Sequence, residues 1–462
     1  MKKDFKKIKR QALTILCCAI SAFFVACDSG STTVDIGKGH DATHNPSQPV
    51  TVVSFEPESG GVGAQILVSG SNFGSDTSAI KVMMDDVYLN VIQSNGKIIY
   101  AIIPAGQPSP SNEAGVISVH IGKGSDLKEV RAPGLFKYDI TPFVSTLAGY
   151  IDEKGNTSVK DGPINEAQFE EPHWLTFDQH KNLYILEEGR GMRFIDKDRS
   201  EVTTKFRTSS GIDRVRTISF TNDYSKMYIT NDDGDENWNG IGTIELSEES
   251  DFTFWKRAIN SRQCNGGDVH PQDNSYFFGS YEQGQVFKWD GRSNPISAKE
   301  NSKELFKIQD RSWEFNIQFH PSGDFAYIVV INKHYILKSY YNSERQELEL
   351  PVLFAGYPDQ AGHRDGVATA ARFNQPYQGT FDKEGNFYVC DRDNHCIRKV
   401  TPQGIVSTFA GRPQNHGYTD GTLRDAQFDR PNGIVYDTDN NEFFIADRQN
   451  RRIRKISMPK NN

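Results

Sequence analysis

Aromatic, charged and amide residues spread along the chain after residue 170 could together bind a ligand. The members of this set are His173, Trp174, Arg214, Trp238, Tyr281, Trp313, Glu314, Tyr377 and Asn432. Such a combination suits sugar rings, because the C–H faces of a sugar are apolar while its rim carries hydroxyl groups. Burial is the competing interpretation for Trp174 and Trp313, since tryptophan is commonly buried. The set predicts a carbohydrate-binding surface, provided that the fold brings its members together.

Metal binding by oxygen ligands is a second chemistry that the sequence suggests. Residues 231–237, NDDGDEN, carry oxygen-bearing side chains at alternate positions, as a calcium loop does. The segment lacks the glycine at the sixth position and the glutamate at the twelfth that an EF-hand loop has. We therefore favour a solvated acidic loop, with calcium as the alternative. The sequence contains no G-x-S-x-G, H-E-x-x-H or P-loop motif, so no catalytic residue is assigned.

The elements that must position these residues form a repeat. Asp365, Gly366, Ala371, Phe373, Pro376 and Asp382 recur at a constant spacing as Asp420, Gly421, Ala426, Phe428, Pro431 and Asp437. A third copy covers residues 149–196, and three degenerate copies lie between it and the last two. The copies contain short runs rich in Val, Ile, Tyr and Phe around polar turns, which indicates antiparallel strands. The sequence thus predicts a repeat architecture of six strand-built units.

The repeated pattern, D-G followed by A-x-F-x-x-P and later by N-x-x-I-R-K, resembles NHL repeats, which build β-propellers from four-stranded blades. The resemblance implies a six-bladed β-propeller over residues 143–458. Residues 144–149, VSTLAG, repeat the outer-strand sequence of the later copies but stand before the first copy. We therefore expect this N-terminal strand to complete the C-terminal blade and close the ring.

In such a ring, the segments before the first strand of each blade and those between its second and third strands emerge on one face. Surface connections commonly carry function, so that face is the expected binding surface. The repeat residues Asp391, Asn394, Asp447 and Asn450 also fall there, and we expect them to cap their turns.

An enzymatic alternative comes from six-bladed propellers of the gluconolactonase and paraoxonase-like kind, which hold calcium in the central channel. The residues that would imitate their ligands are Asp213, Asn265, Glu314, Asn316 and Asn432. Because polar residues are expected at the end of a channel anyway, site geometry has to decide between the two interpretations.

Residues 50–140 show a different pattern of short alternating strands separated by Gly, Pro and Asn turns. The run F-x-P-x-x-G-x-x-G from Phe55 and the turn G-x-N-F-G from Gly70 resemble those of IPT/TIG domains, which have an immunoglobulin-like fold. The resemblance implies a spacer or an interaction module. The expected fold class is therefore all-β, an immunoglobulin-like β-sandwich followed by a six-bladed β-propeller.

Residues 1–26 combine a basic start, an apolar run and small residues before Cys27, and resemble a lipoprotein signal peptide whose cysteine is acylated. An ordinary signal peptide with an incidental cysteine is the alternative. Residues 27–49 are polar and contain Gly, Ser, Thr and Pro, which is typical of a flexible tether. We expect a lipid-anchored protein at the outer membrane, exposed at the cell surface.

The net charge limits the possible partners of the protein, and the cysteine content limits its possible disulfide bonds. The formal net charge is −8 and becomes more negative once the basic signal peptide is removed, which disfavours nucleic acid as a partner. Beyond the signal peptide and Cys27, only Cys264, Cys390 and Cys396 remain, too few for a disulfide framework. Cys390 and Cys396 either bridge the strands of one hairpin or are two buried thiols.

The order of lipid anchor, tether, immunoglobulin-like domain and propeller resembles that of surface lipoproteins with which glycan-harvesting Gram-negative bacteria capture polysaccharide. We therefore expect a non-catalytic protein that binds a polysaccharide or oligosaccharide, with no required cofactor and with an outer-membrane transport protein as a further partner. A calcium-dependent, lactonase-like enzyme and a protein-interaction scaffold are the alternatives.

Overall fold

The computed structural model describes residues 42–61, 64–85, 87–104, 114–122, 127–138, 142–209, 211–292, 297–308 and 314–459. Cys27, Trp313 and the expected signal peptide lie outside these residues. The chain divides into two compact units, the second containing everything from Lys137 onward. Within the described ranges, no helix is long and apolar enough to cross a membrane.

The strands up to Tyr138 form a seven-stranded antiparallel sheet and a small three-stranded one. The large sheet has the order β1 (Thr51–Glu56), β3 (Gln65–Ser71), β6 (Ile98–Ile102), β5 (Val87–Ser94), β4 (Ile80–Met84), β8 (Ile117–Ile121), β9 (Lys128–Arg131). The small sheet has the order β2 (Ser59–Gly60), β10 (Phe136–Tyr138), β7 (Ala114–Gly115). Ile66 and Val68 on β3 are fully buried and alternate with more exposed residues, as on a sheet with one face against a core. The immunoglobulin-like sandwich is confirmed.

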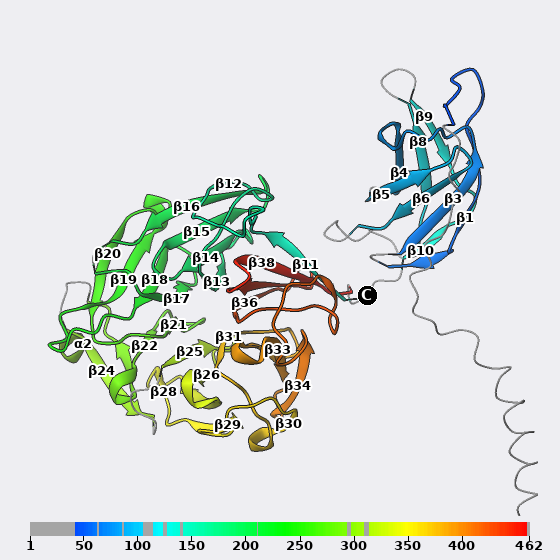
Figure 1. Ribbon diagram of the computed structural model, residues 1–462. Coiled ribbons are helices and arrows are strands. Elements are labelled where there is room, and N and C mark those ends of the chain that lie inside the picture. Colours follow the sequence, from blue (N-terminus) through cyan, green and yellow to red (C-terminus); the bar gives the residue numbers. More distant parts are fainter. Residues whose placement is uncertain are drawn as a thin grey trace, which may run out of the picture. The chain divides into compact units, whose positions relative to one another are not determined.

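The second unit is a ring of six sheets, each of which is one blade (Figure 1). Blade 1 consists of β13 (Pro172–Phe177), β14 (Leu183–Glu187), β15 (Gly191–Asp196) and β16 (Glu201–Arg207), with β12 (Gly162–Pro163) at its edge. Blade 2 consists of β17 (Val215–Phe220), β18 (Lys226–Asn231), β19 (Ile241–Ser247) and β20 (Trp255–Asn260). Blade 3 consists of β21 (Gly267–Val269), β22 (Tyr276–Ser280), β23 (Gln285–Trp289) and β24 (Ser302–Lys307).

The remaining blades follow the same plan. Blade 4 consists of β25 (Phe315–Phe319), β26 (Phe325–Val330), β27 (Tyr335–Asn342) and an outer strand in two pieces, β28 (Glu347–Leu348) and β29 (Val352–Gly356). Blade 5 consists of β31 (Pro376–Phe381), β32 (Phe387–Asp391), β33 (Cys396–Val400) and β34 (Ile405–Ala410), with β30 (Gly366–Val367) at its edge. Blade 6 consists of β36 (Pro431–Asp437), β37 (Glu442–Asp447), β38 (Arg452–Ser457) and β11 (Phe143–Ala148), with β35 (Gly421–Thr422) at its edge.

Helical structure in the described chain is confined to short connections. It comprises α2 (Ala298–Asn301) and the 3₁₀ turns η1 (Thr77–Ala79), η3 (Glu248–Ser250), η4 (Tyr281–Gln283), η5 (Ile331–Lys333), η6 (Ala368–Ala370) and η7 (Arg392–Asn394). The first strands of neighbouring blades contact one another, so β13, β17, β21, β25, β31 and β36 are the inner strands of the ring. The six-bladed propeller of an all-β chain is confirmed.

The expected closure of the ring by the N-terminal strand is confirmed. Strand β11 pairs antiparallel with β38, with Val144 opposite Ile456 and Thr146 opposite Arg454 (Figure 1). The N–H of Thr146 also donates to Asp420 Oδ2 at 3.2 Å. The outer strand of the last blade therefore comes from the beginning of the unit, which ties its two ends together.

The three blades with the most faithful repeat share a buried arginine on the third strand. Arg398 is fully buried, its Nη1 lies 2.8 Å from Asp391 Oδ2, and its Nη2 lies 2.7 Å from Asp365 Oδ1. Arg454 makes the same contacts with Asp447 and Asp420, and Arg193 makes them with Glu187 and Asp161. Asp391 Oδ1 also accepts a hydrogen bond from the N–H of Asn374 at 2.7 Å. The charged residues of the repeat are thus structural, because each buried charge has a partner.

Cys390 and Cys396 are buried free thiols, as is Cys264. In the β32–β33 hairpin Cys390 stands opposite Ile397, and Cys396 stands opposite Asp391, so the two cysteines do not face each other across the strands. Burial raises the pKa of both thiols well above the ordinary value. Of the two possibilities for this pair, the structure has the buried thiols.

Candidate functional site

The two sets of connections that were expected to share a face do so in every blade. In each blade a backbone N–H just after the second strand donates to a carbonyl of the segment that leads into the first strand. These bonds join Glu188 to Glu171 (3.1 Å), Asp232 to Arg214 (3.0 Å), Tyr281 to Gln263 (3.2 Å), Ile331 to Glu314 (2.9 Å), Arg392 to Gln375 (3.3 Å) and Gln449 to Asp429 (3.0 Å). The repeated bond fixes the two connections beside each other at one end of the inner strands.

The side chains gathered at that end are here called the axial cluster. The second residues of five inner strands contribute His173, Arg216, Asn316, Tyr377 and Asn432. The adjoining connections contribute Glu171, Glu188, Arg214, Asp232, Asn265, Tyr281, Glu314, Arg392 and Arg448. The cluster therefore contains the predicted residues His173, Arg214, Tyr281, Glu314, Tyr377 and Asn432.

Four of the six inner strands, β13, β17, β31 and β36, are irregular where they reach the axial cluster. The pairing register shifts between Pro172 and Trp174, and again between Pro431 and Gly433. Blades 2 and 5 have the same irregularity around Arg216 and Tyr377. A bulge turns side chains away from the regular alternation and is common beside functional sites.

A chain of ion pairs crosses the axial cluster from blade 6 to blade 2. Arg448 Nε lies 2.7 Å from Glu171 Oε2, and its Nη2 lies 3.0 Å from Glu188 Oε2. Arg216 Nη1 lies 2.7 Å from Glu188 Oε1, and its Nη2 lies 3.1 Å from Asp232 Oδ2. Burial alone would raise the pKa of Glu188, but Arg216, His173 and Arg448 outweigh it and lower that pKa. Side chains of three blades are thus held in one network.

Several buried polar atoms of this region have no hydrogen-bond partner within the described chain. They are both ring nitrogens of His173, both amide atoms of Asn265, Asp232 Oδ1 and Asn432 Oδ1. Burial lowers the pKa of His173 to about 4; Glu188 opposes this shift, whereas Arg216 and Arg448 add to it. The imidazole is therefore neutral at physiological pH, with one donor and one acceptor nitrogen. Such unpartnered groups are rare inside proteins and often mark the place where something else binds.

Gln378 holds the inner strands on which part of the cluster stands. Its Oε1 accepts hydrogen bonds from the N–H of Leu175 at 2.9 Å and of Ile434 at 3.2 Å, and its Nε2 donates to the carbonyl of Leu175 at 2.7 Å. One side chain of blade 5 thereby fixes blades 1 and 6 beside His173 and Asn432. Nothing in the repeat pattern indicated this role.

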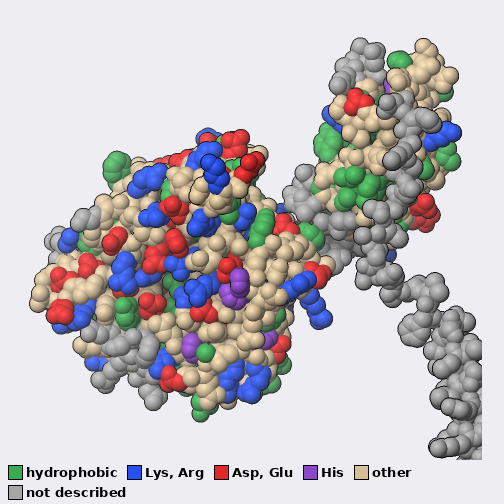
Figure 2. Space-filling model, in the orientation of Figure 1, with side chains coloured by type: hydrophobic (Ala, Val, Ile, Leu, Met, Phe, Trp, Pro, Cys, Tyr) green, Lys and Arg blue, Asp and Glu red, His purple; other side chains and the backbone are tan. Residues whose placement is uncertain are grey.

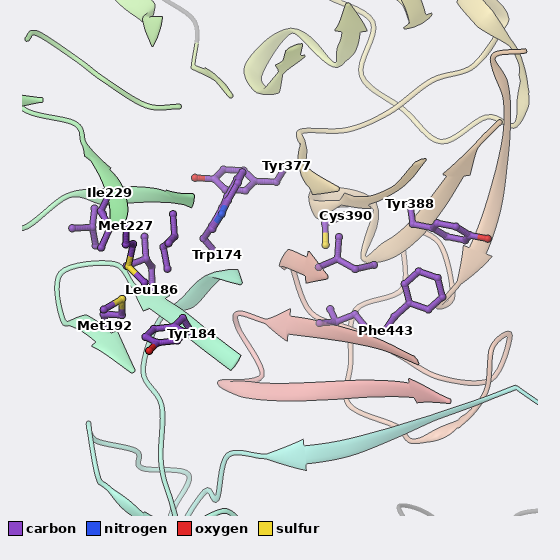
Figure 3. Packing of buried hydrophobic residues seen from close by; sticks show 14 of the residues in the cluster. Trp174, Tyr184, Leu186, Met192, Met227, Ile229, Tyr377, Tyr388, Cys390 and Phe443 are labelled. Atoms are coloured by element: carbon purple, nitrogen blue, oxygen red, sulfur yellow. The ribbon is translucent and has the colours of Figure 1, made fainter. Parts of the chain in front are cut away.

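The structure corrects the prediction that Trp174 and Trp238 offer their rings to a ligand. Trp174 is 4% exposed and packs edge-on against Tyr377, which is equally buried, with ring centroids 6.2 Å apart (Figure 3). Trp238 is buried against Phe287, with the ammonium of Lys299 over its ring at 4.6 Å. The expectation that these rings face a ligand is wrong, because both rings pack in the apolar cores between blades. Trp313 lies outside the described residues.

Some of the oxygen ligands proposed for calcium have other partners, whereas Asn265 Oδ1 and Asn432 Oδ1 have none within the described chain. Asp233 Oδ1 and Asp235 Oδ1 accept backbone N–H groups of their own turn. Asn316 Oδ1 accepts from Gln318 Nε2 at 2.6 Å, and its Nδ2 donates to the carbonyl of Tyr377 at 3.4 Å. Among the described residues, no three His, Cys, Asp or Glu side chains are placed to hold a metal ion.

Arg216 and Arg448 are residues of the cluster that sequence reasoning missed. Arg448 had a signal, because it follows the repeat aspartate Asp447 as Arg392 follows Asp391. Arg216 had none, since its partner Glu188 comes from another blade.

Comparison with known proteins supports the family resemblance of both units of the chain. The IPT/TIG domain family matches residues 49–138. The chain is 34% identical over 329 residues to the protein SUPPRESSOR OF QUENCHING 1, chloroplastic, of Arabidopsis thaliana, which covers 67% of this chain and 27% of that protein. It is 29% identical over 99 residues to NHL repeat-containing protein 2 of Homo sapiens, covering 21% of this chain and 14% of that protein. The chain thus spans about a quarter or less of these curated relatives.

Solved structures match nearly the whole chain. An auxiliary nutrient binding protein from Bacteroides thetaiotaomicron is 39% identical with a TM-score of 0.68, covering 90% of this chain and 99% of that one. A putative phosphatase from the same organism is 32% identical with a TM-score of 0.67, covering 92% and 100%. An auxiliary nutrient binding protein from Bacteroides ovatus is 30% identical with a TM-score of 0.68, covering 90% and 100%.

Proposed function

Since this chain belongs to the family of IPT/TIG and NHL-propeller proteins that includes the Bacteroides relatives above, we propose that its propeller binds a carbohydrate nutrient at the axial cluster. Two of those relatives are named auxiliary nutrient binding proteins. Non-catalytic capture fits a cluster made of hydrogen-bonding groups from different blades.

One observation carries this proposal: polar groups without protein partners gather beneath half-exposed charged side chains at the same end of the ring. Asn265 and Asn432 are at most 2% exposed, and both amide atoms of Asn265 and Oδ1 of Asn432 have no hydrogen-bond partner, as far as the described chain extends. Leaving such a group unsatisfied costs about 1–3 kcal/mol. Proteins tolerate that cost at functional sites, where stability and activity compete.

The half-exposed charged side chains at the same end of the ring have a geometry that suits the binding of sugars. Guanidinium and carboxylate groups are planar, and Arg448, Glu171 and Glu188 stand side by side with 21%, 36% and 28% of their side-chain surface exposed. Tyr281 adds a half-buried ring whose pKa is raised to about 12 by burial first and then by Asp232 and Glu314. Adjacent donors, acceptors and an aromatic edge match the alternating surface of a saccharide.

We further propose that Cys27 carries a lipid that anchors the protein to the outer membrane at the cell surface, with the IPT/TIG domain as a spacer and a transport protein as partner. The resemblance of residues 1–27 to a lipoprotein signal supports this. Labelling cells with an alkyne fatty acid should mark the wild-type protein and not the Cys27→Ser variant. Equal labelling of both would exclude this anchor.

Binding is tested with the mature chain on a glycan array, followed by calorimetry on the glycans retained. We expect at least one saccharide to bind, and the Asn265→Ala/Asn432→Ala variant to bind it at least tenfold more weakly. Asn440→Ala, at an exposed turn at the opposite end of the strands, is the matched control. Retention of no saccharide, or undiminished binding by the double variant, would contradict the proposed function.

A further inference from the structure

We propose that the axial cluster selects uncharged, polyhydroxylated ligands, so that neutral glycans bind and their uronic-acid counterparts do not. This inference rests on the proposed function and narrows its ligand class. It follows from the way in which the charges of the cluster are already paired.

Each arginine of the cluster is bonded to a carboxylate of the same chain. Arg214 Nη2 lies 2.6 Å from Asp232 Oδ2, and Arg392 Nε lies 3.4 Å from Asp393 Oδ1. Arg216 and Arg448 each contact two carboxylates, those of the ion-pair chain described above. Arginine clusters that bind acidic ligands offer free guanidinium groups for bidentate bonds. An anionic ligand at Arg216 or Arg448 would have to compete with two carboxylates that already contact the guanidinium.

The carboxylates also oppose an acidic ligand directly. Glu171, Glu188 and Glu314 are at least partly exposed at the cluster, and the chain as a whole is acidic. On the face of the propeller seen in Figure 2, acidic and basic side chains intermingle, as is expected of a surface without a strong single-sign field. Like charges that meet at a binding surface lower the affinity by about tenfold or more.

Paired arginine and glutamate suit hydroxyl groups instead. A guanidinium offers donors only and a carboxylate acceptors only, while a hydroxyl group does both. The guanidinium of Arg448 lies within 3.0 Å of carboxylate oxygens of Glu171 and Glu188, so donors and acceptors lie beside one another. Neighbouring hydroxyls of one sugar can bond to both kinds of group. Of the buried residues with unpartnered atoms in this region, His173, Asn265 and Asn432 are uncharged, and Asp232 is a carboxylate whose other oxygen is paired with Arg214 and Arg216.

The test uses matched pairs of oligosaccharides that differ only in the carboxylate at C6: galactose and galacturonate, glucose and glucuronate, mannose and mannuronate, each as a tetramer. We expect the neutral member of at least one pair to bind the mature protein at least tenfold more tightly than its uronate. The Glu171→Gln variant frees Arg448 from one carboxylate, so it should bind uronates at least threefold more tightly than the wild type. Glu384→Gln, an exposed carboxylate of a turn at the opposite end of the strands, is the control for charge alone.

A second variant, Glu188→Gln, repeats the test at the other carboxylate that contacts Arg448, and both variants are checked by their thermal unfolding. Tighter binding of uronates than of neutral members by the wild type would overturn the selectivity proposed here and leave the proposed function standing. A Glu384→Gln variant that gains as much uronate affinity as Glu171→Gln and Glu188→Gln would also overturn it. Failure of every saccharide on the array would overturn the proposed function itself.

Discussion

Glu188 of blade 1 and Arg216 of blade 2 are joined by a hydrogen bond of 2.7 Å between Oε1 and Nη1. Arg448 of blade 6 reaches the same carboxylate from the other side, with Nη2 3.0 Å from Oε2. One carboxylate therefore links three blades across the place where the ring closes. Because the side chain of Arg216 is only 8% exposed, its charge depends on Glu188 and Asp232 for compensation.

The Arg216→Met variant should be destabilised by about 3 kcal/mol, since the buried carboxylate of Asp232 and the partly buried carboxylate of Glu188 each lose one of their two arginine partners. Urea unfolding followed by tryptophan fluorescence measures the loss. The control is Arg199→Met, whose side chain is 78% exposed and lies 3.5 Å from Asp196. For such a surface pair we expect a change below about 1 kcal/mol. Equal effects of the two substitutions would contradict a structural role for the ion-pair chain.

Replacing Gln378 by methionine, of similar length, should destabilise the propeller by about 2 kcal/mol or more. The backbone N–H groups of Leu175 and Ile434 would lose their acceptor inside the ring, and a buried donor left unpaired costs about 1–3 kcal/mol. Gln403→Met, at an exposed turn, serves as control. Unchanged urea midpoints for Gln378→Met would show that other groups fix the inner strands.

The stability of the wild type should fall on acidification because of His173. The unfolded chain takes up a proton near pH 6.5 and the folded chain only near pH 4, so stability is lost as the pH falls through this window. From pH 7 to pH 5 the loss from this residue is about 2 kcal/mol. Urea unfolding of the wild type and of His173→Phe at the two pH values gives the free energy of unfolding of each. The difference between their pH dependences isolates the contribution of His173 from that of other titrating groups.

The same variant separates unpartnered from partnered histidines. His270 is also buried, but its Nε2 lies 3.0 Å from the carbonyl oxygen of Gly323. At pH 7 we expect His270→Phe to lower the free energy of unfolding by about 1 kcal/mol, because it removes this hydrogen bond, and His173→Phe to lower it less. A larger loss at His173 than at His270 would indicate that bound water already satisfies the His173 ring.

Proline at Val144 should open the ring. Val144 is fully buried and paired with Ile456, and proline in a paired strand removes a ladder hydrogen bond. Hydrogen exchange followed by mass spectrometry should show faster exchange in β36–β38, with β17–β19 on another part of the ring less affected. Unchanged protection of β38 would mean that the strand pairing contributes little to closure.

The three thiols should be inert in the folded protein. Cys264, Cys390 and Cys396 are fully buried, and burial raises their pKa, that of Cys264 to about 12. A thiolate reagent should therefore label them only after unfolding. Intact mass under non-reducing conditions checks the free state, since a bridge between Cys390 and Cys396 would lower it by the mass of two hydrogens.

The repeat itself determined the blades. Asp365, Pro376 and Asp391 recur with their strands and turns, and turn chemistry and strand alternation act between residues close in sequence. Residues 144–149 repeat the outer-strand sequence of the other blades, so they predicted the closing strand. The fold class could therefore be predicted from local patterns.

Only the tertiary structure decided the site. The partners of Glu188 are Arg216 and Arg448, and Gln378 bonds to Leu175, so each contact joins different blades. No local periodicity encodes which residues of separate blades meet at the axis. The same holds for Trp174, whose type suited a sugar platform but whose ring is buried, because packing between blades, rather than residue type, sets its exposure.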